Sequence, residues 1–169
     1  MKPVLQKPTP ALVRAFVEKF NTNPDTNGPC IQIDKLVKLY SLNNDLYEIW
    51  AKVVVINQFY ATNIKATFPV AQNILRLNID AAIEGGDPNV VAQIARMKFK
   101  KKVINFYSFA TKYCSFHSPS KFPIYDQYVD KLLRAYRDEY PFAMFSADDL
   151  KEYGKFKEVV NQFQVYFGL

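Results

Sequence analysis

Glycine is scarce in this chain, and this scarcity most narrows what the chain can fold into. The 169 residues include only five glycines. Tight β-hairpin turns depend on positive φ angles, which glycine adopts more readily than any other residue. An architecture with many hairpins is therefore poorly supplied with turn residues, and the long apolar stretches are expected to form helices.

Apolar residues recur with helical spacing along most of the chain. Thr9-Pro10 can open a first helix, because threonine caps helix N-termini and proline fits the first turn. A loop is expected over Asn21–Pro29, followed by a helix over Ile31–Tyr40. A longer helix should run from a cap at Asn43 or Asn44 towards Thr67, the next from Pro69 to Gly85-Gly86, and a short one from there through Met97. Further helices are expected over Lys101–Phe116, over Asp126–Tyr136 and after Ser146–Asp149. The prediction is one compact all-α domain over residues 1–169, with about eight helices.

The composition indicates a folded, basic protein. Hydrophobic residues make up 49% of the chain, which argues against disorder. Lysine and arginine number 22 against 16 acidic residues, giving a net charge of +6 and a pI of about 9.2. This balance favours polyanionic partners. The cations cluster over Arg96–Lys102, which is either a solvated helix start or a phosphate-binding patch.

The residues exclude several kinds of site. Cys30 and Cys114 are the only cysteines and His117 is the only histidine. A disulfide framework, a zinc or iron–sulfur centre and a histidine-based triad are therefore not expected, and no metal or cofactor is predicted. The N-terminus lacks the apolar stretch of a signal peptide, and no apolar run approaches the ~20 residues of a membrane span. We expect a cytoplasmic monomer without membrane association.

One segment resembles a known enzyme family. It has a lysine-rich start, an apolar helix, a loop and then Phe-Pro-Ile-Tyr-Asp-Gln-Tyr-Val at 122–129. This resembles the catalytic core of the helix-hairpin-helix DNA glycosylases, in which a Pro-Ile/Val-Asp-x-x-Val stretch places an aspartate at a helix N-terminus beside the base pocket. Asp126 matches that aspartate. Lys102-Val103-Ile104-Asn105-Phe106 is similar to the Lys-x-Ile-x-Phe pattern of the archaeal 8-oxoguanine glycosylases, with Lys101 as an alternative lysine.

The resemblance implies a DNA glycosylase fold and excision of a damaged or modified purine, such as 8-oxoguanine, from double-stranded DNA. Asp126 would stabilise positive charge on the sugar of a flipped-out nucleotide. Lys102 would attack C1′ and form a Schiff base, which permits strand cleavage as an abasic-site lyase. The residues themselves leave both roles open, since Asp126 equally fits a helix N-cap and Lys102 a solvated lysine.

Three further residues fit DNA contacts in this resemblance. Asn57 and Gln58 resemble the polar pair on the helix that lines the base and inserts into the duplex. They fit equally well as satisfied polar contacts between helices. His117 either contacts a base or only closes the helix before the loop, where a histidine is electrostatically reasonable. Lys112, in the middle of the same helix, is expected to be solvated.

The phosphate-binding hairpin departs from the family pattern. The family uses a Gly-x-Gly-like turn whose backbone N–H groups hold a DNA phosphate, and residues 95–102 contain no glycine. Either the hairpin is rebuilt, with Lys98, Lys100 and Lys101 holding phosphate as point charges, or DNA binding has been lost. Two rival functions follow: a non-enzymatic nucleic-acid-binding module and a protein-interaction domain, both retaining the helical fold.

Overall fold

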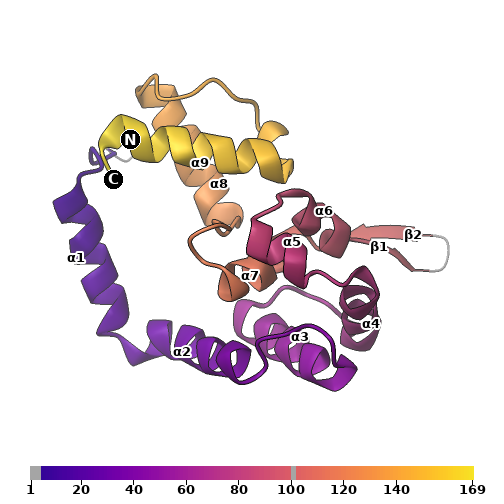
Figure 1. Ribbon diagram of the computed structural model, residues 1–169. Helices are drawn as coiled ribbons and strands as arrows, with labels where there is room; N and C mark the ends of the chain where they lie inside the picture. The colour runs from indigo at the N-terminus through magenta and orange to yellow at the C-terminus, as the bar shows by residue number, and fades with distance from the viewer. Residues whose placement is uncertain (1–4, 100–101) are drawn as a thin grey trace. The chain divides into compact units, whose positions relative to one another are not determined.

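The computed structural model describes residues 5–99 and 102–169. Within these ranges the chain is mostly helical, as predicted, with nine α-helices, one short 3₁₀ helix and two strands (Figure 1). The chain divides into two compact units. Pro29–Tyr125 form the first, and the residues up to Gly28 together with Asp126–Leu169 form the second. A single domain over the whole chain stays a prediction.

The first unit is built around α3 (Leu46–Tyr60). This helix packs against α4 (Thr67–Leu77) and α7 (Tyr107–His117), and α6 (Asn89–Ala95) packs against both α4 and α7. The short α5 (Asp80–Gly85) and most of α2 (Pro24–Leu39) complete its helices. Apolar side chains from these helices form a buried core, which includes Ile33, Ile49, Val53, Ile56, Val70, Ile74, Val90, Ile94 and Phe109. Each such burial stabilises the unit by roughly 1.5–3 kcal/mol.

α3 begins after the asparagines that we expected to cap it. Asp45 is the N-cap, and its Oδ1 accepts hydrogen bonds from the backbone N–H groups of Tyr47 (2.8 Å) and Glu48 (3.0 Å). The helix ends at Tyr60 because Ala61 adopts the left-handed conformation, with φ 46°. The prediction that this helix runs towards Thr67 is therefore wrong. Near its start, Trp50 contacts Phe68 edge-on, with ring centroids 5.1 Å apart.

The helix predicted from Pro69 to the paired glycines is two helices. Pro69 lies in the first turn of α4, as expected, but α4 stops at Leu77 because Asn78 adopts φ 48°. α5 then runs from Asp80 to Gly85, and Gly86, with φ 72°, ends it. Asparagine tolerates the left-handed conformation better than other residues with a Cβ, which explains the break.

The helix predicted over Lys101–Phe116 is wrong over its first residues. Strands β1 (Arg96–Phe99) and β2 (Lys102–Asn105) form an antiparallel pair between α6 and α7 (Figure 1). The helix expected from Lys101 therefore begins only at Tyr107. A hydrogen bond from Phe106 N–H to the Ala95 carbonyl, 2.9 Å long, closes the base of the pair. The apolar, β-branched character of Val103 and Ile104 favours a strand here.

The second unit contains α1 (Pro10–Asn21), α8 (Gln127–Glu139), the 3₁₀ helix η1 (Asp149–Lys151) and α9 (Tyr153–Phe167). Aromatic rings join α8, α9 and the segment between them, and these rings are Tyr136, Tyr140, Phe142, Phe163 and Phe167. Where a helix start was predicted over Ser146–Asp149, the short η1 begins at Asp149 and α9 only at Tyr153, and Ser146 and Asp149 form reciprocal hydrogen bonds before them. Ser146 N–H and Oγ donate to Asp149, and the Asp149 N–H donates back to Ser146 Oγ.

α1 forms where the sequence predicts it but leaves its apolar stripe in solvent. Thr9 Oγ1 accepts from the Leu12 N–H at 3.1 Å, and Pro10 is the first helical residue. No residue of α1 is buried, and its exposed apolar residues are Val13, Phe16, Val17 and Phe20. The loop expected over Asn21–Pro29 is wrong, because α2 already begins at Pro24. None of the described helices is both long and apolar enough to cross a membrane.

The adjacent glycines at the end of α5 provide a matched test of this local structure. A Cβ at Gly85 would meet no atom within 4 Å, whereas a Cβ at Gly86 would lie 3.2 Å from Cδ of Lys121 at a φ of +72°. We expect Gly85→Ala to raise the free energy of unfolding by about 0.5 kcal/mol. Gly86→Ala should lower it by about 1 kcal/mol or more.

Urea unfolding followed by Trp50 fluorescence measures both effects, because the only tryptophan lies in the same unit as both glycines. Equal stability of the two alanine variants would contradict the assigned conformation of Gly86.

Candidate nucleic-acid interface

The β1–β2 hairpin presents two chemically different faces. Direct cross-strand partners share a face of a sheet and successive residues alternate between faces. The register pairs Arg96 with Asn105 and Lys98 with Val103, so these four residues form one face, which we call the outer face. The inner face, by the same register, consists of Met97, Phe99, Lys102 and Ile104.

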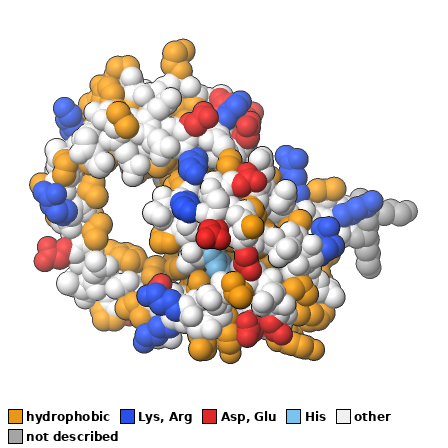
Figure 2. All heavy atoms as spheres, viewed as in Figure 1, with side chains coloured by type: hydrophobic (Ala, Val, Ile, Leu, Met, Phe, Trp, Pro, Cys, Tyr) orange, Lys and Arg blue, Asp and Glu red, His pale blue; other side chains and the backbone are white. Residues whose placement is uncertain are grey.

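Burial separates the two faces on β1, whereas all four residues of β2 are exposed. All four outer-face residues are exposed, and Val103 reaches 72% exposure. On the inner face, Met97 is only 7% exposed, and the Phe99 ring packs edge-on against Phe106 with centroids 6.4 Å apart. The inner face therefore anchors the hairpin to its unit and leaves the outer face open. In Figure 2, Lys and Arg side chains gather on the hairpin, at the right of the view.

The cations of the hairpin have no anionic partner in the described part of the chain. The two strands contain no aspartate or glutamate. None of the ion pairs formed by the described residues involves Arg96, Lys98 or Lys102. Lys100 and Lys101, predicted to hold phosphate, lie outside the described residues. Lys98 is exposed on β1, as a phosphate contact requires.

Lys102 occupies a different setting from the one the resemblance implies. It is the exposed first residue of β2, paired with Phe99, and four residues separate it from the start of α7 at Tyr107. The expectation that it begins a helix is therefore wrong. Lys102 belongs to the first unit and Asp126 to the second, so the proximity of amine and carboxylate stays a prediction.

Asp126 caps a helix, as one of its two predicted roles requires. It is the N-cap of α8 in extended conformation, and its Oδ1 accepts from the backbone N–H groups of Tyr128 (2.8 Å) and Val129 (2.9 Å). Its side chain is half-buried at the beginning of the helix. These bonds satisfy two N–H groups that the helix leaves without intrahelical partners.

Asn57 and Gln58 lie on α3 in contrasting surroundings. The Asn57 amide holds the segment after α3, because its Oδ1 accepts from Thr62 Oγ1 (2.8 Å) and Ile64 N–H (2.9 Å). Its Nδ2 donates to the Ile64 carbonyl at 3.1 Å. Asn57 is thus a satisfied polar group that fixes a helix end, whereas Gln58 is exposed. Contact of either side chain with DNA stays a prediction.

A buried polar network in the first unit was not predicted from the sequence. Lys52, on α3, is 0% exposed, and its Nζ donates to the carbonyls of Tyr40 (2.8 Å) and Leu42 (2.9 Å) and to Asn43 Oδ1 (2.9 Å). Tyr113 OH donates to the same Asn43 oxygen at 2.5 Å. The Asn43 backbone N–H and Nδ2 donate to the Asp80 carboxylate at 3.0 and 2.6 Å. The network therefore links α3, α5 and α7.

Charges in this network are set by burial. Burial lowers the pKa of Lys52 to about 8, although the carboxylates of Asp80 and Glu48 act in the opposite direction. Lys52 therefore remains mainly protonated at neutral pH, which matches its three hydrogen-bond acceptors. Burial also raises the pKa of the Tyr113 hydroxyl, which keeps the hydroxyl as a donor to Asn43.

His117 belongs to the margin of this network. It is the last residue of α7, and its ring lies 5.1 Å from the ring of Tyr113. Burial, followed by repulsion from Lys52, lowers the pKa of His117 to about 4. Its Nε2 is shielded from solvent and has no hydrogen-bond partner within the described ranges. The helix-closing role is thus present, and contact with a DNA base stays a prediction.

Lys112 is also buried, so the expectation of a solvated lysine is wrong. It is 3% exposed, its Nζ donates to Ser108 Oγ at 2.7 Å, and it lies 5.4 Å from the centroid of the Tyr60 ring. In the structure every residue from Phe109 to Ser115 is buried. An α-helix that is hydrophobic on more than one face has no solvent side for a lysine.

No group of three or more potential metal ligands occurs among the residues described. Both cysteines are free thiols, with Cys114 buried and Cys30 half-buried. Burial raises the pKa of the Cys114 thiol, which disfavours the thiolate that nucleophilic or metal-binding cysteines need. The amines of the hairpin and the half-buried carboxylate of Asp126 are the candidate groups that the sequence singled out for chemistry.

Comparison with known proteins gives a family without a stated activity. Residues 12–121 match the family HI_0787_N, described as an N-terminal domain. A protein of Haemophilus influenzae (strain ATCC 51907 / DSM 11121 / KW20 / Rd), named as an uncharacterized protein, is 41% identical over 128 residues. The aligned region covers 75% of this chain and 64% of that relative, so the chain spans less than two thirds of the relative's length. No solved structure matches the chain.

The lowered pKa of His117 predicts a pH dependence of stability. In the unfolded chain the imidazole titrates near 6.5, and in the folded chain near 4. Between these values the unfolded chain binds more protons, so stability falls as the pH drops from 6.5 and levels off near 4. We expect a loss of about 2 kcal/mol between pH 7 and 4.5.

Urea unfolding followed by Trp50 fluorescence measures this loss, and His117→Phe should remove most of it. Proton NMR titration of the only histidine gives the pKa without any substitution. An imidazole that titrates near its ordinary value in the folded protein would contradict the burial of His117.

Proposed function

The chain belongs to the HI_0787_N family, and on that premise we propose that it binds double-stranded DNA through the outer face of the β1–β2 hairpin. One observation carries the proposal: Arg96 and Lys98 stand exposed on a face without acidic residues, while Met97 behind them is buried. Cations placed in this way attract a polyanion, because no carboxylate among the described residues forms an ion pair with them.

The form of the hairpin suits a duplex. A two-stranded β-ribbon fits the major groove of B-DNA, which is about 12 Å wide. Phosphate contacts by lysine and arginine release condensed counterions, and this release supplies most of the affinity in sequence-independent binding. The net charge of +6 acts in the same direction over longer distances.

The salt dependence of binding tests this proposal. For wild-type protein, the affinity for a short duplex should fall steeply between about 50 and 200 mM salt. Arg96→Ala/Lys98→Ala should flatten the slope of log K against log salt by about 2, since each lost phosphate contact removes about 0.9. Fluorescence anisotropy of a labelled duplex measures both quantities.

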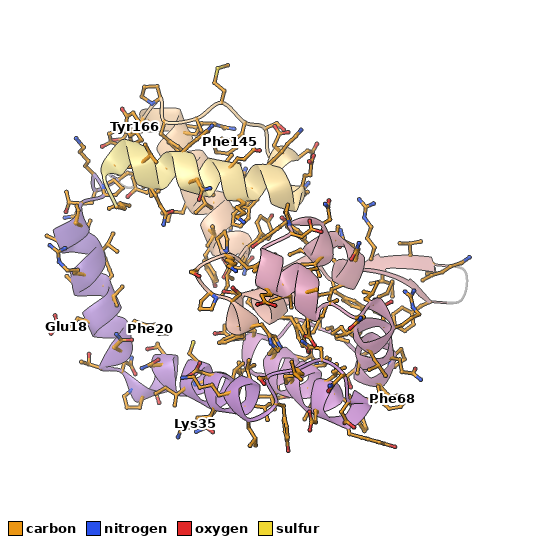
Figure 3. All side chains as sticks on the ribbon, in the orientation of Figure 1. Glu18, Phe20, Lys35, Phe68, Phe145 and Tyr166 are labelled. Carbon is orange, nitrogen blue, oxygen red and sulfur yellow. The ribbon has the colours of Figure 1, made fainter. Side chains whose placement is uncertain are left out.

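Lys35→Ala/Lys65→Ala is the matched control. It removes the same charge from exposed positions of the same unit outside the hairpin, and Figure 3 labels Lys35 on α2. If both double variants lose affinity equally, the attraction comes from net charge and not from the hairpin. If wild-type protein does not bind DNA at low salt, the proposal fails and a protein-interaction role takes its place.

Base excision is a second candidate, and the setting of Asp126 favours it. Its half-buried carboxylate lies at the N-terminus of α8, the position that the resemblance gives to the glycosylase aspartate. There it would stabilise positive charge on the sugar as the bond to a damaged purine breaks. The neutral amine of Lys102 would attack C1′ as the base leaves, and opening of the sugar would give a Schiff base.

Borohydride trapping tests this second candidate. Wild-type protein incubated with duplexes that carry 8-oxoguanine or an abasic site should yield a covalent adduct after reduction. Lys102→Gln should lose at least nine tenths of the adduct, because only an amine forms the Schiff base, while Lys98→Gln should retain it. DNA binding with neither an adduct nor base release would refute excision and leave the first proposal standing.

A further inference from the structure

The outer face of the hairpin carries more than charge. Arg96 and Asn105 are direct cross-strand partners, which places their Cβ atoms about 5 Å apart. Both side chains are exposed. Arginine forms two parallel hydrogen bonds to guanine, and asparagine forms two to adenine, both in the major groove. The register therefore places two side chains that read bases next to each other.

Resting on the proposed function, we infer that the outer face reads base edges in the major groove and prefers duplexes with neighbouring guanine and adenine. Arg96 contacts the guanine and Asn105 the adenine. Successive base pairs rise about 3.4 Å, so cross-strand neighbours reach adjacent pairs. The preference is sequence-specific and adds to the charge-driven binding.

Two outer-face residues distinguish this inference from phosphate binding alone. Asn105 is neutral and Val103 is apolar, so neither neutralises a phosphate. Val103 precedes Asn105 by two residues along β2, a distance of about 7 Å or two base-pair steps. Apolar side chains in the major groove contact the thymine methyl group, and such a contact would bury a side chain that is 72% exposed in the free protein.

Asn105 has no structural task that would explain it otherwise. It lies two residues before α7, where asparagine often caps a helix. The N-cap position of α7 is Phe106, and no side chain caps that helix. The side-chain amide of Asn105 forms no hydrogen bond to any residue in the described ranges. Its cross-strand partner Arg96 forms no ion pair in those ranges. As far as the described residues go, both groups are free to meet a ligand.

The test compares sequence preference with sequence-independent affinity. Selection of bound duplexes from a random library should enrich a short element with adjacent guanine and adenine when wild-type protein is used. Arg96→Lys keeps the charge but removes the fork of donors, and Asn105→Ala changes no charge. Each should reduce the preference at its base pair by roughly 5- to 100-fold, with the salt slope and the affinity for unrelated DNA unchanged within about twofold.

Arg14→Lys and Asn161→Ala are the controls, since both positions are exposed and lie in the other unit. They should leave the preference intact. Wild-type binding without any enriched element overturns the inference but leaves the proposed function in place. Absence of any DNA binding overturns both. Trp50 fluorescence in urea checks that every variant keeps its stability.

Discussion

The first unit depends on the buried ammonium group of Lys52, whose three N–H donors all form hydrogen bonds to oxygen atoms. An uncompensated buried charge costs several kcal/mol, and such a charge is retained only where its hydrogen-bonding capacity is used. Lys52 donates to two backbone carbonyls and one side-chain amide, all from residues 40–43. These bonds fix the connection between α2 and α3. Through Asn43 the same arrangement reaches Asp80 and Tyr113, on two further helices.

The hairpin is held by the core that this network organises. Ala95, at the end of α6, is fully buried, and the chain passes directly into β1. The hydrogen bond from Phe106 N–H to the Ala95 carbonyl joins the two ends of the hairpin, directly before α7 begins. Rigid helices at both ends restrict the hairpin base, so a ligand that binds the outer face meets side chains already in place. Such preorganisation reduces the entropy lost on binding.

Local chemistry in the sequence predicted most helices and several caps. Thr9 and Asp126 cap the helices they were expected to cap, because capping depends on residues within one turn. The β1–β2 hairpin was not predicted because a low glycine content limits the number of hairpins in a chain but does not exclude a single one. The sequence between Phe99 and Lys102 contains no glycine, so nothing there indicated a turn. For the same reason Lys102 was expected at the start of a helix, whereas it is the first residue of β2.

The buried network could not be predicted for a different reason. The partners of Lys52 are mostly backbone carbonyls ten and twelve residues earlier in the chain, and backbone groups leave no mark in a sequence. Lys52 and Lys112 both look like ordinary surface lysines on amphipathic helices. Only the packing of α3 against α7 decides that both are enclosed. Tertiary structure here overrides the usual preference of lysine for solvent.

Asn43 has an evolutionary consequence for the whole network. Its single oxygen serves both Lys52 and Tyr113, while its nitrogens serve Asp80. A replacement at this position alone would remove hydrogen bonds from Lys52, Tyr113 and Asp80 at once, and the resulting losses of stability would not be additive. Substitutions at position 43 should therefore be epistatic, tolerated in descendants of this chain only together with compensating changes at 52, 80 or 113. Related sequences should vary at these four positions as a set.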